Sequence, residues 1–183
     1  MPTKTSPLPT VLSIHHAAFR CFDAEETRVF YEDVLGLELA AALVFDEAPG
    51  TSTPLDYMHL FFRLGDGNFV AFFDLPDHLA KAKFAQTSGF NRHIALRVAG
   101  EADLIAYRDR LTAADIKVDG PIDHGFVRSI YTYDPNGIQV EITCPTADHD
   151  AILAEDARHA RAAIARWTEV THARKATVRA ASA

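Results

Sequence analysis

The stretches His16-Ala-Ala-Phe-Arg-Cys21 and His93-Ile-Ala-Leu-Arg-Val98 decide the fold, because the second repeats the first. Their numbering differs by a constant offset, 93 − 16 = 77, and each places a histidine at the head of an apolar segment of strand character. Side chains alternate along a strand, so each histidine shares a face with the residues two and four positions later. A repeated opening of this kind predicts an internal duplication.

The segments around these histidines follow the same order of elements in both halves of the chain. The first half predicts a helix stopped by Gly36 and four strands, with ranges 11–22 (strand), 25–35 (helix), 37–45, 58–64 and 69–75 (strands). The second half predicts 91–98 (strand), 101–114 (helix), 116–118, 127–133 and 138–144 (strands). We therefore expect an α+β fold in which two tandem βαβββ units, 11–76 and 90–145, form a curved mixed sheet.

The two ends of the chain fall outside this module of residues 11–145. Residues 1–10 contain three prolines and are expected to form a loose N-terminal arm. Residues 146–183 are expected to hold a C-terminal helix to about Thr171, docked on the sheet or on a second subunit, with a frayed tail from Arg174.

Composition limits the classes of function. The formal net charge is −7 (18 − 25), with no basic block outside the tail, which argues against a nucleic-acid partner. No segment is apolar for long enough to span a bilayer, and Cys21 and Cys144 form no CxxC motif, so we expect a protein of the reducing cytoplasm. Its partners should be small molecules or copies of itself.

One carboxylate in the last strand calls for a partner. Glu141 shares a face with Gln139 and Thr143, while the other face is apolar. If the two units close, His16, His93 and Glu141 can converge as a set of two imidazoles and one carboxylate, which leaves adjacent metal positions open. The alternative is that the histidines are ordinary strand residues with satisfied hydrogen bonds.

Four longer stretches, read in order, resemble the vicinal oxygen chelate superfamily, which includes glyoxalase I, fosfomycin-modifying transferases, bleomycin-resistance proteins and extradiol dioxygenases. They are Ile14-His-His-Ala-Ala-Phe19, Phe30-Tyr-Glu-Asp-Val-Leu-Gly-Leu-Glu-Leu39, Arg92-His-Ile-Ala-Leu-Arg-Val98 and Tyr133-Asp-Pro-Asn-Gly-Ile-Gln-Val-Glu-Ile142. The resemblance covers residues 11–145 and implies the same fold and metal site, but it does not explain the C-terminal helix. Glyoxalase I carries a fourth ligand, a Glu, where this chain has Ala71 or Phe72, depending on the alignment.

The resemblance is closest to single-module relatives of the extradiol dioxygenases. It implies catalytic roles for Tyr131, ten residues before Glu141, for His78, fifteen residues before His93, and more loosely for His124. The plainer alternatives are a packed tyrosine and two solvated loop histidines. Strand alternation allows some of five aromatic residues to wall a substrate pocket: Phe61, Phe62, Phe72, Phe73 and Phe126.

The expected function is cleavage of a catechol-like aromatic diol with O2, as in aromatic-compound catabolism, by a cytoplasmic homodimer. The cofactor is a divalent metal, with Fe(II) favoured over Mn, Ni and Zn. The alternatives are a metal-dependent isomerase, lyase or thiol transferase of the glyoxalase and fosfomycin type, and a bleomycin-type binding protein.

Overall fold

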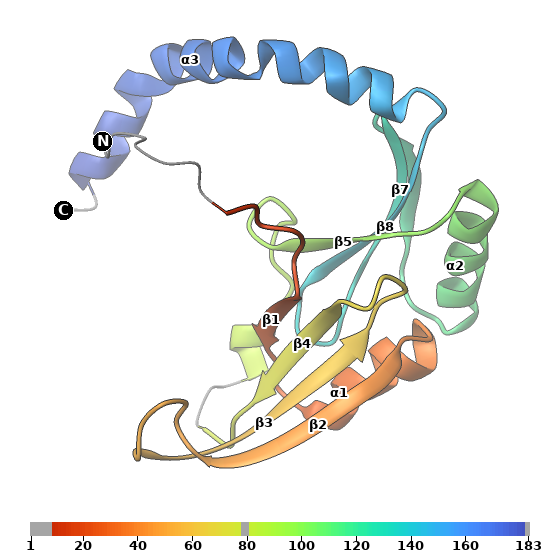
Figure 1. Ribbon diagram of the computed structural model, residues 1–183, viewed down its shortest axis with the longest axis vertical. Helices are drawn as coiled ribbons and strands as arrows, with labels where there is room; N and C mark the ends of the chain where they lie inside the picture. The colour runs from red at the N-terminus through yellow and green to blue at the C-terminus, as the bar shows by residue number, and fades with distance from the viewer. Residues whose placement is uncertain (1–8, 78–80, 182–183) are drawn as a thin grey trace. The chain divides into compact units, whose positions relative to one another are not determined.

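The computed structural model describes residues 9–77 and 81–181 of the 183-residue chain. Residues 1–8 of the predicted arm therefore lie outside the described part. Figure 1 shows the elements in chain order: β1 His16–Arg20, α1 Ala24–Arg28, η1 Val29–Val34, β2 Glu38–Glu47, β3 Pro54–Arg63, β4 Phe69–Asp74, η2 Lys81–Phe84, β5 His93–Arg97, α2 Glu101–Ala113, β6 Asp119–Asp123, β7 Val127–Tyr133, β8 Gln139–Pro145 and α3 His149–Ala181.

The strands fall into two four-stranded sheets with the same order, β1-β4-β3-β2 and β5-β8-β7-β6. This confirms the α+β class and the duplicated βαβββ pattern, with one sheet for each repeat. The first sheet is mixed, because β1 pairs parallel to β4 whereas β3 runs antiparallel to both β2 and β4.

Contacts divide the chain into two compact units. Unit 1 comprises Met1–Ile94, Asp109–Lys117 and Thr132–Val140; unit 2 comprises Ala95–Arg108, Val118–Tyr131 and Glu141–Ala183. We describe each unit by itself.

In unit 1, one face of the first sheet forms the core. Phe62, Val70 and Phe72 are at most 1% exposed, and the two phenylalanine rings pack with that of Tyr31 in η1, which lies between β1 and β2 along the chain. The Tyr31 hydroxyl donates a hydrogen bond to Asp134. The opposite face of the sheet carries His16.

The first helix begins as the sequence predicts. Asp23 caps α1 by accepting a hydrogen bond from the Glu26 amide at 2.8 Å, and the helix continues as the π-helix η1. Gly36 follows with a φ of +78°, a left-handed conformation that favours glycine and ends the helix.

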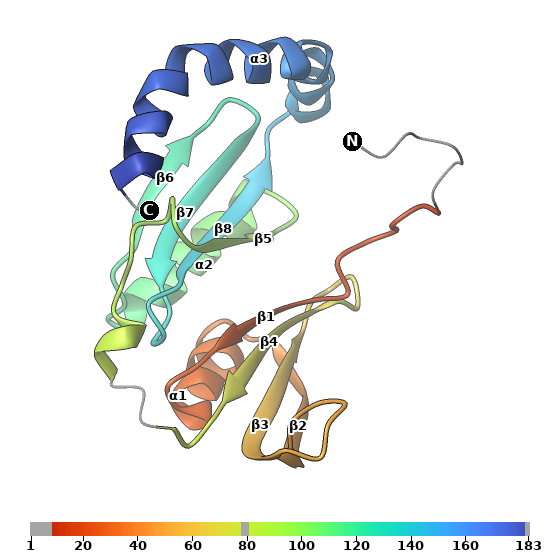
Figure 2. The same cartoon turned by 90° about the vertical axis from the view of Figure 1, so that its left-hand side faces the viewer.

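Two predicted boundaries were wrong. The strand expected over 116–118 lies at Asp119–Asp123, because the Ile116 amide instead bonds to the Leu111 carbonyl and closes the end of α2. The C-terminal helix continues through Ala181 where we expected fraying, since the alanine-rich sequence after His149 contains no glycine or proline to stop it. Figure 2 shows α3 as one continuous, bowed helix.

Candidate metal centre and its surroundings

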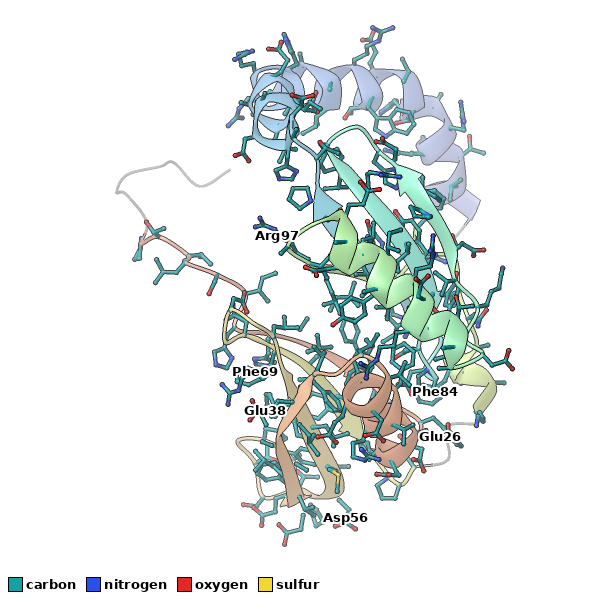
Figure 3. The ribbon with its side chains drawn as sticks, turned by 90° about the vertical axis from the view of Figure 1, so that its right-hand side faces the viewer. Glu26, Glu38, Asp56, Phe69, Phe84 and Arg97 are labelled. Carbon is teal, nitrogen blue, oxygen red and sulfur yellow. The ribbon has the colours of Figure 1, made fainter. Side chains whose placement is uncertain are left out.

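His16 opens β1, opposite Phe69 of β4, which is labelled in Figure 3. Its side chain is exposed, and its Nδ1 lies 2.9 Å from Nδ1 of His15, so one ring donates a proton to the other. If His16 is the donor, its Nε2 carries the lone pair that a metal requires. His15 is therefore placed to orient His16.

His59 on β3 is a neighbour of His16. Its ring centroid lies 6.1 Å from that of His16, and it stacks on Phe73 at 3.8 Å. Burial lowers the pKa of His59 below its ordinary value of 6.5, and proximity to His16 lowers that pKa further. A neutral imidazole thus lies beside the candidate ligand; only the pairing of β3 with β4 reveals this proximity.

Equivalent backbone hydrogen bonds in the two sheets define the numbering offset between the repeats. The Cys21 amide donates to the Phe73 carbonyl, and the Val98 amide donates to the Thr143 carbonyl. The numbering offset between the repeats is 98 − 21 = 77 in the first strands and 143 − 73 = 70 in the last strands. The counterpart of Glu141 in the first repeat is therefore position 71, from 141 − 70.

This register selects Ala71, not Phe72, as the position of a fourth ligand. Ala71 pairs with Ala18, two residues after His16, and so lies on the His16 face of the sheet. Phe72 lies on the other face, where its ring is 4.8 Å from that of Tyr31. The methyl side chain of Ala71 cannot bind a metal.

His93 opens β5, and its Nδ1 lies 2.8 Å from the carbonyl oxygen of Gly89. A carbonyl accepts and cannot donate, so Nδ1 carries the proton in this contact. A neutral His93 therefore has its lone pair on Nε2. This is the arrangement common to metal-binding histidines, whose other ring nitrogen donates to a carbonyl or carboxylate.

Glu141 lies in β8 and is only 8% exposed. The buried hydroxyl of Ser129, on β7, donates a hydrogen bond to Oε1 of Glu141 at 2.5 Å. The Ser129 oxygen also lies 3.0 Å from the Thr143 hydroxyl, which in turn bonds to the Arg128 carbonyl. The Glu141 carboxylate is thus oriented by the Ser129 hydroxyl within unit 2.

Tyr131 and His124 are brought together in unit 2. Nε2 of His124, in the turn between β6 and β7, lies 2.7 Å from the Tyr131 hydroxyl. Burial raises the pKa of Tyr131, and the Glu141 carboxylate raises it further, against a hydrogen bond from Ser129 that lowers it. The Tyr131 hydroxyl and His124 Nε2 share one hydrogen bond, and Tyr131 lies two strand positions from Ser129, the residue that holds Glu141.

The other predicted site residues are placed differently. His78 lies outside the described residues. Of the aromatic candidates, Phe61 and Phe73 share the His16 face, whereas Phe62 and Phe72 pack in the core of unit 1. Phe126 stacks near His149 at the start of α3, with ring centroids 5.9 Å apart.

Two imidazoles and one carboxylate, from His16, His93 and Glu141, are chemically suited to bind a divalent metal. The described residues contain no group of three or more His, Cys, Asp or Glu side chains that could hold a metal ion. His93 has the tautomer of a ligand, and Glu141 has the supporting hydrogen bond of one. His16 and His93 belong to unit 1 and Glu141 belongs to unit 2.

Among the described residues, no helix is long and apolar enough to cross a membrane.

Residues 13–142 match the model of the Glyoxalase/Bleomycin resistance protein/Dioxygenase superfamily. No curated protein sequence matches the chain.

Solved structures share the fold. A glyoxalase/dioxygenase from Nostoc punctiforme is 26% identical, with a TM-score of 0.52 over 76% of this chain and 99% of that one. A glyoxylase/bleomycin resistance protein/dioxygenase domain from Frankia sp. EAN1pec is 14% identical, with a TM-score of 0.60 over 75% of this chain and 100% of that one.

The fosfomycin resistance protein FosX from Listeria monocytogenes is 18% identical, with a TM-score of 0.55 over 78% of this chain and 99% of that one. That structure is of a mutant in complex with Mn(II) and 1S,2S-dihydroxypropylphosphonic acid. The family match, from position 13 to position 142, takes in well over half of the 183-residue chain. The chain therefore belongs to the glyoxalase/bleomycin resistance protein/dioxygenase superfamily.

Proposed function

We propose that this protein is a ring-cleaving dioxygenase of the extradiol type, which binds one divalent metal ion through His16, His93 and Glu141. The observation that carries the proposal is the 2.7 Å contact between His124 and Tyr131, on the strand whose Ser129 holds Glu141. It supplies a proton acceptor and a phenol donor beside a candidate ligand. These are the groups that an aromatic diol substrate requires.

The roles of the chain's own residues follow from their contacts. His124, which is hydrogen-bonded to Tyr131, takes the proton from a catechol hydroxyl and later returns it. Tyr131, kept neutral by its raised pKa, donates a hydrogen bond to the oxygen on which negative charge develops. Bound Fe(II) would supply Lewis-acid activation of the diol and would mediate electron transfer from the diolate to O2.

The residue at position 71 supports oxygen chemistry over a glyoxalase reaction. A glyoxalase I site has a fourth protein ligand, and Ala71 occupies the position that the internal repeat equates with Glu141. Three ligands leave more open positions on the metal, enough for two diol oxygens and O2. Phe61 and Phe73, on the His16 face, offer an apolar surface on which a planar ring can stack.

A second candidate is a metal-dependent enzyme of the fosfomycin type that uses no O2. It is favoured by the structural similarity to FosX in complex with Mn(II). The same three ligands serve both reactions, and Mn, Ni or Zn would replace Fe(II). A bleomycin-type binding protein is disfavoured, since sequestration alone needs no metal ligands.

The test begins with metal content. Protein purified without oxygen and loaded separately with Fe(II), Mn(II), Ni(II) or Zn(II) is expected to bind about one ion per chain. His16→Ala, His93→Ala and Glu141→Ala should each abolish binding, whereas His172→Ala, on the exposed surface of α3, should not. Unchanged metal content in all three ligand variants would remove the proposed site.

Activity then separates the two reactions. The Fe(II) enzyme is expected to consume O2 and form a yellow ring-opened product from 2,3-dihydroxybiphenyl or a 3-alkylcatechol, measured with an oxygen electrode and by visible absorbance. Methylglyoxal with glutathione, and fosfomycin with thiols, serve as controls. Turnover of a control without O2 uptake, with inert catechols, would promote the second candidate.

A further inference from the structure

Helix α3 lies beyond the match to the superfamily, which ends at residue 142, and the proposed function assigns it no role. Of its 33 residues, Thr171 is buried and His149 and Ile152 are half-buried; every other described side chain is exposed. The exposed side chains include Leu153, Ile164, Trp167 and Val178, of which the last three are more than 60% exposed. A helix that exposes this many apolar residues marks an interaction surface.

These residues follow a heptad pattern. One series, with a spacing of seven, is Leu153, Ala160, Trp167 and Arg174; the other is Ala157, Ile164, Thr171 and Val178. Each member of the second series comes four positions after a member of the first, which is the spacing from a d position to the next a position of a coiled coil. The stripe runs from Leu153 to Val178, nearly four heptads, which is enough to indicate a coiled coil.

The stripe is also symmetric about its centre. In an antiparallel pair centred on this stripe, two positions face each other when their residue numbers add up to 331. Each such pair joins a d position to an a position: Leu153 with Val178, Ala157 with Arg174, Ala160 with Thr171, and Ile164 with Trp167. Two antiparallel copies of one helix place d residues opposite a residues in this manner. The small residues Ala160 and Thr171 lie next to the central layer and leave room for the indole of Trp167.

The charges of α3 favour the antiparallel arrangement over the parallel one. Residues 149–164 contain three acidic and two basic side chains, a net charge of −1, while residues 165–181 contain four basic and one acidic, a net charge of +3. Antiparallel pairing places the acidic half of one helix beside the basic half of the other. It also places Asp156, in the flanking g position, on the same side of the interface as Arg174 of the second copy.

From this pattern we propose that α3 is a dimerisation element, which pairs with α3 of a second copy of this chain as an antiparallel coiled coil. The two-fold axis passes between Ile164 and Trp167. Pairing covers the apolar members of the stripe that are exposed in the single chain, Leu153, Ile164, Trp167 and Val178. The partner is a second copy because the stripe complements itself in both size and charge.

The first experiment measures the oligomeric state of the full chain by sedimentation velocity over a concentration series. We expect a dimer. Ile164→Glu should raise its dissociation constant by about 100-fold or more, because two unpaired carboxylates would be buried. Ala162→Glu adds the same charge outside the stripe and should leave the dimer unchanged.

Charge exchange tests the register. Asp156→Arg and Arg174→Asp should each weaken the dimer, because each places like charges together across the interface, and the double variant should restore it. A wild-type monomer at all concentrations, or a dimer indifferent to Ile164→Glu, would overturn the proposal.

Cross-linking tests the direction of the helices. Leu153→Cys and Val178→Cys chains, mixed and oxidised, should form a disulfide between the two variants, whereas neither variant alone should cross-link through its new cysteine. In the antiparallel pair, identical positions at either end lie about 37 Å apart, given a rise of about 1.5 Å per residue from position 153 to position 178. Cross-linking of each variant with itself would show a parallel pair, and no cross-link in the mixture would show that α3 docks elsewhere; either result rejects the proposal.

Discussion

Nε2 of His124 lies 2.7 Å from the hydroxyl oxygen of Tyr131, although the two residues come from a turn and from the strand that follows it. The two groups form one hydrogen bond, so a single proton lies between them. We propose that they act as a unit in catalysis, in contrast to a solvated loop histidine beside a packed tyrosine.

The first prediction concerns this pair. Tyr131→Phe and His124→Phe are each expected to lower catechol turnover by about 100-fold or more, the usual contribution of a general acid or base, while metal content stays the same. The double variant should be hardly worse than either single one. Steady-state kinetics with metal analysis provides the measurement, and Tyr133→Phe, on the same strand, is the control. Losses that simply multiply would contradict a shared function.

The second prediction concerns the support of Glu141. Ser129→Ala removes the hydroxyl that bonds to Oε1, so the carboxylate loses its fixed orientation and the metal dissociation constant should rise by about 10-fold to 100-fold. Thr132→Val is the control, because its hydroxyl bonds to the Lys117 carbonyl instead. Titration with a metal indicator compares the variants. Equal affinities in wild type and Ser129→Ala would remove Glu141 from the metal site.

The third prediction uses the position that lacks a fourth ligand. Ala71→Glu places a carboxylate on the His16 face, where it is buried and destabilising without a counter-charge, so the metal-free variant should melt at a lower temperature. Divalent metal should raise its melting temperature by more than it raises that of wild type, since a fourth ligand strengthens binding to the folded state. Differential scanning calorimetry with and without Zn(II) measures both effects.

Ala71→Gln is the matched control for that prediction, because it adds nearly the same volume without a charge. O2 uptake with catechols should also fall in Ala71→Glu, as a coordination position becomes occupied. Equal stabilisation of the Glu and Gln variants by metal would show that residue 71 does not face the ion.

The fourth prediction concerns pH. Burial raises the pKa of the Cys21 thiol from 9.0 to about 12. Below pH 9 both the folded and the unfolded state hold this proton, and its contribution to stability is complete. As pH rises from 9 to 12, the unfolded state releases the proton first, so the free energy of unfolding falls.

Urea unfolding across that pH range tests this sign, and Cys21→Ala should show a shallower decline than Cys144→Ala, which keeps the Cys21 thiol. Both thiols are at most 2% exposed, so the folded protein should resist iodoacetamide at pH 8.5, and the unfolded protein should react at two sites. Rapid alkylation of Cys21 in the folded protein would contradict the prediction.

Local patterns in the sequence were enough for much of the fold. The alternation after His16 and His93 and the Gly36 helix stop each depend on residues close together in the chain. The strand expected over 116–118 failed because Ile116 closes a helix, a use of its backbone that hydrophobicity does not reveal. The length of α3 was underestimated because its exposed, charged end has little to bury yet strong helix propensity.

The sequence by itself thus determined the duplicated α+β fold and proposed the residue types of a candidate metal site, because both depend on periodicity and spacing. The tertiary structure alone decided that Ala71 faces His16 while Phe72 enters the core, that His59 stacks beside His16, and that Ser129 holds Glu141. Each of these facts depends on the register between strands separated by tens of residues or by a hairpin, and a shift of one residue would turn every side chain to the opposite face. That register is fixed by inter-strand hydrogen bonds, such as those from Cys21 to Phe73 and from Val98 to Thr143, which form only when the chain has folded.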